Sequence, residues 1–259
     1  MQPSRKFAPE RHWIEGGEAP PAGRGAEGGA PALHPLVHAN VSTLRLQRYR
    51  SRFDGSRRFP VDHAGRPSAL AHAGMACAAI GLALVGEAHA VGIALSEVAW
   101  HDLPPTMAGR TVLVDLFERT DGGIDFEIRG HAGPGDPHTL HCRGSGRLLR
   151  RSDRPAHASV PLDPDGAGAT PSLSEGTLSE LGRAWHATGP ILQAPGRLQF
   201  STDVQADMAS TWTVPPMLLD SAVHAAAVLA GGVGAGTPAR PVRLSSLQVF
   251  APCRGRVLT

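Results

Sequence analysis

The chain has 259 residues, of which 41% are hydrophobic, so it is long enough for one large domain with a sizeable core. Charged residues make up 19% and leave a net charge of only +2, which disfavours nucleic acid or a membrane surface as a partner. No segment has the length and hydropathy expected of a membrane span or a secretory signal. Cys77, Cys142 and Cys253 form no C-x-x-C pair, which predicts reduced thiols and a cytoplasmic protein.

The first part of the chain has the composition of a linker. Residues 16–32 are almost entirely Gly, Ala, Pro, Glu and Arg, a mixture that cannot bury a core. We therefore expect residues 1–32 to form an upstream tail and the globular part to begin at Leu33. The apolar Trp13 and Ile14 within the tail are expected to pack on the body.

The next part predicts one buried helix among strands. Val41–Phe53 alternates with a period of two, which is typical of a half-buried strand. Ser68–Gly86 is apolar or small at nearly every position, which predicts a helix buried on most sides. Turn sequences then separate four strand-like segments, which are Val91–Trp100, Thr111–Arg119, Ile124–His131 and Thr139–Leu149.

A helix followed by strands occurs again after a polar segment rich in Pro and Gly. The predicted elements of this second part are a helix at Ser172–His186, strands at Arg197–Val204 and Ala209–Val214, an apolar helix at Met217–Leu229 and a closing strand at Arg240–Phe250. The pattern indicates the α+β class. It divides the globular part into residues 33–150 and 172–259, joined by an interior linker at 151–171.

Six short stretches carry motifs whose order and spacing are informative together. They are Phe7–Glu15, His34–Val37, Asp62-His63, His141–Gly144, Thr188–Gln193 and Pro215–His224. In this order they resemble the motifs of dehydratase domains, or dehydratase-like domains, of modular type I polyketide synthases. The resemblance implies a double hot-dog fold, in which each of two long buried helices is wrapped by a curved antiparallel sheet.

Four positions depart from the motifs of that family. Counting from His63, the glycine of the H-x-x-x-G-x-x-x-x-P motif falls on Pro67 and its proline on His72. Thr188 replaces the tyrosine of Tyr-Gly-Pro, and Pro215 replaces the histidine of His-Pro-Ala. The departures affect the surroundings of the site, whereas the two presumed catalytic residues are kept.

The resemblance implies that His63 and Asp220 face each other across one tunnel. Dehydration of a β-hydroxyacyl thioester needs a base for the α-proton, and a neutral histidine suits that task. It also needs an acid for the leaving hydroxyl, and burial among apolar neighbours is expected to raise the pKa of Asp220. His224, one helical turn later, is expected to orient Asp220. The expected tunnel residues are Pro67, His72, Thr188, Gly189, Pro190 and Pro216.

Simpler interpretations of these residues remain open. His63 follows Pro60 in a polar loop and would otherwise be an ordinary surface histidine. Asp220 follows two prolines and is also placed to cap the Met217–Leu229 helix near its N-terminus. His138 and His141 point to opposite faces if they lie on a strand, so no metal site is expected.

The leading hypothesis is elimination of water from a β-hydroxyacyl chain held on an acyl carrier protein. No cofactor is expected, because the phosphopantetheine arm belongs to the carrier. A neighbouring ketosynthase and a second copy of the chain are the other expected partners. Two alternatives remain, namely a diverged domain that serves chain branching or ring formation, and a non-catalytic structural domain.

Overall fold

The computed structural model describes ten segments of the chain, which are residues 32–54, 58–62, 66–84, 90–133, 135–154, 191–194, 197–204, 214–230, 240–250 and 255–258. The described residues, from Ala32 onward, belong to one compact unit. The predicted tail, with Trp13 and Ile14, therefore lies outside the described residues. Within the described part, no helix has the length and apolar character needed to cross a membrane.

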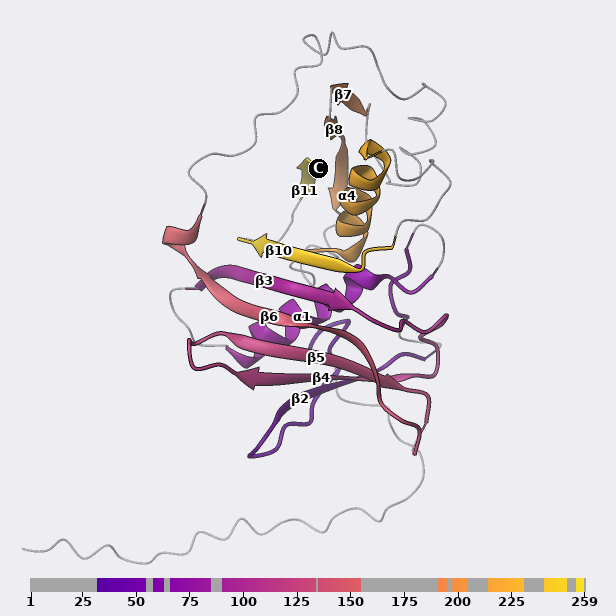
Figure 1. Cartoon of the computed structure of the whole chain (residues 1–259), viewed down its shortest axis with the longest axis vertical. Coiled ribbons are helices and arrows are strands. Elements are labelled where there is room, and N and C mark those ends of the chain that lie inside the picture. The colour runs from indigo at the N-terminus through magenta and orange to yellow at the C-terminus, as the bar shows by residue number, and fades with distance from the viewer. Residues whose placement is uncertain are drawn as a thin grey trace, which may run out of the picture. The chain divides into compact units, whose positions relative to one another are not determined.

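A seven-stranded antiparallel sheet forms the centre of the compact unit (Figure 1). Its spatial order is β1-β2-β4-β5-β6-β3-β10. The strands are β1 (Ala39–Asn40), β2 (Gln47–Arg52), β3 (Ala90–Trp100), β4 (Thr111–Glu118), β5 (Ile124–His131), β6 (Thr139–Arg150) and β10 (Arg243–Val249). The four strand-like segments predicted between residues 91 and 149 are confirmed as β3 to β6. The strand predicted at Val41–Phe53 is shorter, because the chain turns before Gln47.

Helix α1 (Ala69–Ala83) packs on one face of this sheet, as predicted (Figure 1). Ser68 is its N-cap, because the Ser68 Oγ accepts a hydrogen bond from the backbone N–H of Ala71. Met75 and Ile80 are fully buried and meet the inward-facing Phe126 and Ile128 of β5 in one core. Full burial of such a side chain stabilises the fold by about 1.5–3 kcal/mol. The predicted α+β class is therefore confirmed.

The later part of the chain supplies the second long helix and four short strands. They are α4 (Pro216–Leu229), β7 (Leu192–Ala194), β8 (Arg197–Gln199), β9 (Ser201–Val204) and β11 (Gly255–Leu258), with a 3-10 turn at Arg151–Asp153. The predicted strand Arg197–Val204 is interrupted at the buried Phe200. The interruption allows β8 to pair with β7 and β9 to pair with β11. The predicted helix at Ser172–His186 and nearly all of the strand at Ala209–Val214 lie outside the described residues.

Strand β10 connects the two parts of the unit. It pairs along β3 from Ile93 to Ala99, and the N–H of Trp100 donates to the carbonyl of Val242. On its other side β3 pairs with β6, where the register shifts between Ser96 and Ala99. Glu97 in this bulge has a positive φ of 51° and an exposed side chain that pairs with Arg243 of β10.

Two of the three cysteines lie in the described residues, and both are buried. Cys77 on α1 and Cys142 on β6 are unpaired. Burial raises the pKa of Cys77 to about 12 and also raises the pKa of Cys142. Both thiols are therefore protonated and unreactive at neutral pH.

Candidate active site

Asp220 lies inside α4, at its fifth residue, and not at its cap. The helix begins after Pro215, which makes no side-chain cap hydrogen bond, and Pro216 occupies the first helical position. The interpretation of Asp220 as a capping residue is therefore wrong. The two prolines fix where the helix begins, and Asp220 is placed more than one turn further on, facing α1.

The carboxyl group of Asp220 meets the N-terminus of α1. Ser68 Oγ donates a hydrogen bond to Asp220 Oδ2 at a distance of 2.7 Å. Ser68 itself is fully buried, and its backbone N–H donates to the carbonyl of Pro60 at 3.0 Å. The helix that follows Ser68 and the helix that carries Asp220 thus meet at a buried polar contact.

Burial is the main influence on the acidity of Asp220, and it raises the pKa to about 7. The hydrogen bond from Ser68 acts in the opposite direction because it favours the charged carboxylate. The negative charge of Asp62 raises the pKa further. A carboxyl group with this pKa is partly protonated at neutral pH, and it is therefore able to donate a proton.

Asp62 belongs to a narrow loop that returns to α1. Val61 and Pro67 form an isolated antiparallel bridge, and the N–H of Asp62 donates to the carbonyl of Arg66 at 2.7 Å. The Arg66 guanidinium binds Asp62 Oδ2 at 3.0 Å, and the Arg66 N–H donates to Asp62 Oδ1 at 2.9 Å. These contacts fix both ends of the segment that contains His63. His63 itself lies outside the described residues.

Pro67 precedes the cap of α1, and Pro216 opens α4. Pro216 is buried, and its Cγ lies 3.9 Å from the position that a Cβ on Gly74 would occupy. The two helices therefore lie close enough at Gly74 for α4 to come within ordinary contact distance of a side chain at that position. A cavity of about 10 Å³ remains between these helices and β10, lined by Gly74, Cys77, Leu219 and Leu247 among others. It has room for about one water molecule.

His72 is buried in the core one turn after Ser68. Its ring lies against Phe59, with centroids 5.1 Å apart, and against His141 of β6. Burial is the main cause that lowers the pKa of His72 to about 3 and that of His141 to about 4. Both rings are therefore neutral at physiological pH, and neither is a cationic group for binding an anion.

The remaining predicted residues divide into two groups. His224 is on α4 and almost fully buried, one turn after Asp220. Its orienting role stays a prediction. Thr188, Gly189 and Pro190 lie outside the described residues, and the tunnel itself stays a prediction. His138 lies just before β6, is exposed and stacks on His131, whereas His141 lies on β6 and is buried.

Sequence reasoning missed the contact between Ser68 and Asp220. A serine directly before a long apolar run is a recognisable cap signal, so the position of Ser68 at a helix start was predictable. Its second partner is 152 residues away along the chain, and no local pattern indicates such a pairing. Asp62 was visible as part of the Asp-His motif, but its electrostatic effect on Asp220 was not.

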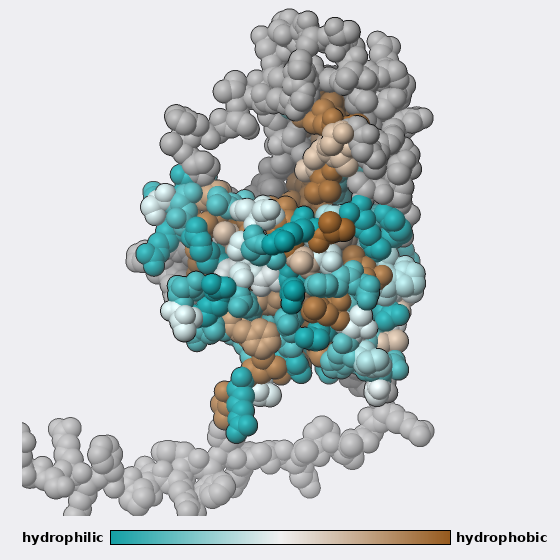
Figure 2. Space-filling model, in the orientation of Figure 1, coloured by the Kyte–Doolittle hydropathy of each residue, from teal (hydrophilic) through white to brown (hydrophobic). Residues whose placement is uncertain are grey.

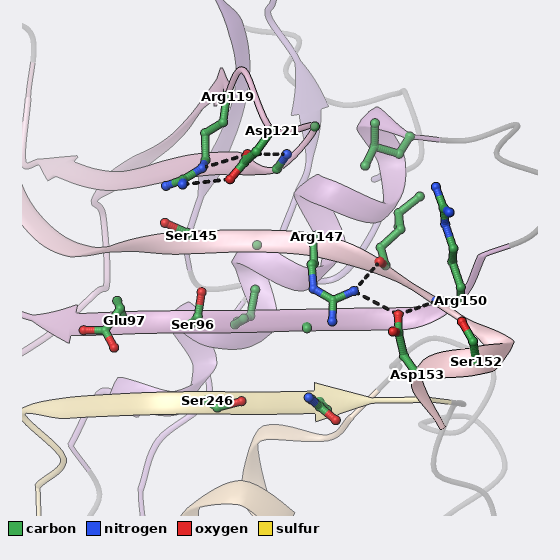
Figure 3. A pocket seen from close by; sticks show the side chains of 18 residues that line it. Ser96, Glu97, Arg119, Asp121, Ser145, Arg147, Arg150, Ser152, Asp153 and Ser246 are labelled. Carbon is green, nitrogen blue, oxygen red and sulfur yellow. Dashed lines mark hydrogen bonds and ion pairs between the residues drawn. The ribbon is translucent and has the colours of Figure 1, made fainter. Parts of the chain in front are cut away.

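A broader hollow lies on the opposite face of the sheet from α1. It has a volume of about 960 Å³ and is lined by β3, β6 and β10 together with the turn at Arg119–Gly123 and the corner at Arg150–Asp153 (Figure 3). Two of its arginines are paired with acids, Arg119 with Asp121 and Arg147 with Asp153. Charged and polar side chains dominate this face of the molecule (Figure 2). Neither Ser68 nor Asp220 lines the hollow, so it is separate from the candidate site.

Comparisons with known proteins identify relatives of the chain. No protein-family model matches it. Polyketide synthase PksN of Bacillus subtilis is 30% identical over 279 residues, covering 98% of this chain and 5% of PksN. Polyketide synthase ThaG of Burkholderia thailandensis is 30% identical over 269 residues, covering 97% of this chain and 5% of ThaG. The chain therefore corresponds to a small segment of these very long proteins.

Solved structures identify the fold. The dehydratase domain of RzxB from Pseudomonas fluorescens superposes with a TM-score of 0.70 at 22% identity, covering 88% of this chain and 86% of that domain. A trans-AT polyketide synthase dehydratase domain from Brevibacillus brevis gives a TM-score of 0.68 at 22% identity, with the same coverage. The predicted resemblance and fold are thereby confirmed. The chain is related to a segment of modular polyketide synthases and has the double hot-dog fold of their dehydratase domains.

Proposed function

We propose that the chain is a dehydratase-type domain that removes water from a β-hydroxyacyl thioester carried on an acyl carrier protein. The observation that carries this proposal is the contact of the partly buried Asp220 carboxyl group with Ser68 at the start of the first long helix, where burial raises the pKa of Asp220 to about 7. The relatives that match nearly the whole chain are polyketide synthases, which supports the same class of substrate.

In this mechanism the α-proton passes to His63, and the electrons of the C–H bond form the new double bond. The C–O bond breaks, and the hydroxyl leaves as water with the proton of Asp220. His63 is then protonated and Asp220 is a carboxylate, so one proton transfer restores both. The closed loop between Asp62 and Arg66 supports this assignment, because it carries His63 directly after a residue whose charge acts on Asp220.

No cofactor is required by this chemistry, since the proposed acid and base are side chains of the protein. The acyl carrier protein would present the thioester on its phosphopantetheine arm. We also propose a neighbouring ketosynthase as a contact and a homodimer as the assembly. Sedimentation that yields only monomer at micromolar concentration would count against the dimer.

The test uses purified protein and β-hydroxyacyl carrier proteins with short and α-methylated chains. Mass spectrometry of the carrier-bound acyl group should detect loss of water, or gain of water from the enoyl form. His63→Ala and Asp220→Asn should each lower the rate by on the order of 10² to 10⁴. Ser221→Ala is the matched control, because the Ser221 hydroxyl lies next to Asp220 but donates to Met217 of its own helix at 2.8 Å.

A second candidate is a diverged domain that serves branching or ring formation. The observation that favours it is His72, which occupies the core position where the motif places proline and brings a second buried ring, His141, next to it. Such a domain would bind acyl carrier protein and give neither loss nor gain of water with any substrate. That result would remove the dehydratase proposal, and the branching or structural role would replace it.

A further inference from the structure

Ser68 makes three contacts that together join three parts of the molecule. Its N–H binds the carbonyl of Pro60, at the start of the loop that carries His63. Its Oγ accepts the N–H of Ala71 at 3.1 Å and so begins α1. The same Oγ donates to Asp220 Oδ2 on α4. No local requirement of a helix cap explains the third contact, because an N-cap needs only to accept from the backbone.

We propose that Ser68 is a positioning residue for Asp220, which fixes Oδ2 by its hydroxyl proton and leaves Oδ1 as the oxygen that faces the substrate. This inference rests on the proposed function and adds a residue that the motifs do not indicate. A serine hydroxyl has one proton. The cap contact with Ala71 fixes the position of the Oγ, so the hydroxyl proton is directed at Asp220.

The burial of Ser68 restricts the movement of its hydroxyl group. Ser68 has no exposed surface, and Leu70 and Ala71, which follow it, are equally enclosed. Among the described residues, Ser68 is the hydrogen-bond partner of the Asp220 carboxyl group. A rotation of that carboxyl group would break this contact and leave the fully buried Ser68 hydroxyl without its acceptor on α4. The orientation of Asp220 is therefore set from α1 and not only from its own helix.

The first experiment measures the titration of Asp220 directly, by ¹³C NMR of aspartate carboxyl carbons, with Asp220→Asn used to assign the resonance. Removal of the hydroxyl in Ser68→Ala should raise the pKa of Asp220, because the hydrogen bond favours the carboxylate. Ser221→Ala, which removes a neighbouring buried hydroxyl, should leave it unchanged. Equal titration of Asp220 in wild type and Ser68→Ala would overturn the proposal.

The second experiment measures the pH dependence of turnover. The rate should fall at high pH as the acid loses its proton, and Ser68→Ala should move this alkaline limb to higher pH. The kcat of Ser68→Ala should fall by about 10- to 100-fold, because the acid is less well oriented toward the leaving hydroxyl. Its KM should change little. Ser68→Thr, which keeps the hydroxyl, should restore the wild-type limb. An alkaline limb at the same pH in Ser68→Ala and wild type would contradict the positioning role.

Two provisions keep the test decisive. If Ser68→Ala does not fold because the cap is lost, Ser68→Gly replaces it, since glycine is tolerated at an N-cap and has no hydroxyl. If the wild type has no activity with any substrate, the proposed function fails while the NMR titration still decides the role of Ser68. A raised pKa of Asp220 in Ser68→Gly, together with an unchanged pKa of Asp220 in Ser221→Ala, supports the positioning contact. Equal pKa values of Asp220 in the two variants would overturn it.

Discussion

His72 and His141 meet edge to face inside the core, with ring centroids 5.6 Å apart and planes at 84°. Among the described residues, no hydrogen bond reaches either nitrogen of His72 or the Nδ1 of His141. The backbone carbonyls of Ser68 and Ala69 favour a charged His72 ring only weakly compared with the opposing effect of burial. The pair is therefore stable only when both rings are neutral.

Acid should destabilise the protein through this pair. A histidine whose pKa is lowered on folding contributes stability above its unfolded pKa of about 6.5, and that contribution is lost as the pH falls towards the folded value. Below pH 6.5, each histidine should lower the free energy of unfolding by up to about 1.4 kcal/mol per pH unit. In urea unfolding, the free energy of unfolding of His72→Leu should fall less steeply with decreasing pH than that of the wild type. His138→Leu, at the exposed stacked pair, is the control and should leave the slope as it is.

The contribution of Asp220 to the pH dependence of stability should have the opposite sign. Its pKa is raised from 3.8 to about 7, so its contribution to stability is complete below pH 3.8 and is lost as the pH rises through 7. Asp220→Asn should therefore be more stable than wild type at pH 8, by on the order of 1 to 4 kcal/mol, and the difference should vanish near pH 4. Asp136→Asn changes an exposed carboxylate and is the control. Equal stability of Asp220→Asn and wild type at pH 8 would argue against a buried acid.

The histidine experiment is best done in the Asp220→Asn background, because the opposing effect of Asp220 on the pH dependence is then removed.

Asp62 and Arg66 should shift the pKa of Asp220 in opposite directions. Asp62→Asn removes the negative charge that raises this pKa, so the Asp220 titration should move to lower pH. Arg66→Gln removes the guanidinium that neutralises Asp62, so the titration should move to higher pH. ¹³C NMR measures both. Shifts of the same sign in the two variants would exclude a charge effect and indicate a change in loop conformation.

Gly130 and Gly81 should respond oppositely to the same substitution. A Cβ on Gly130 of β5 would collide with the His141 ring, so Gly130→Ala should cost about 1 to 3 kcal/mol of stability. Gly81 lies in α1, where a Cβ would sit 3.5 Å from Ile93 Cδ1, an ordinary contact. Gly81→Ala should stabilise the protein by about 0.5 to 1 kcal/mol. Thermal unfolding of the two variants provides the comparison.

The sequence predicted the elements whose patterns are long and regular. The apolar run at Ser68–Gly86 and the alternating strand β5 agree with the structure because each pattern is repeated over many residues. The short strands β7 and β11 were missed, since three or four residues carry too little periodicity. Arg197–Val204 has one strand pattern, and only the separate partners of β8 and β9 reveal the interruption at Phe200.

The candidate site was predictable as a set of residue types but not as a geometry. The resemblance indicated Asp220, and its apolar neighbours indicated a raised pKa. The capping interpretation failed because Pro216, and not Asp220, occupies the start of α4. The partnership with Ser68 and the influence of Asp62 depend on how α1 packs against α4, which is a long-range property of the fold.

During synthesis, β3 and β6 leave the ribosome long before β10 does. One edge of β3 therefore stays unpaired until β10 is made. An uncovered strand edge invites pairing with another nascent chain. The bulge between Ser96 and Ala99 shifts the pairing of β3 with β6, whereas the pairing with β10 stays in regular register. The charged Glu97 within the bulge is exposed. Bulges and charges are the devices that discourage such pairing. We therefore expect the charge of Glu97 to discourage such pairing until β10 arrives, when Arg243 pairs with the same glutamate.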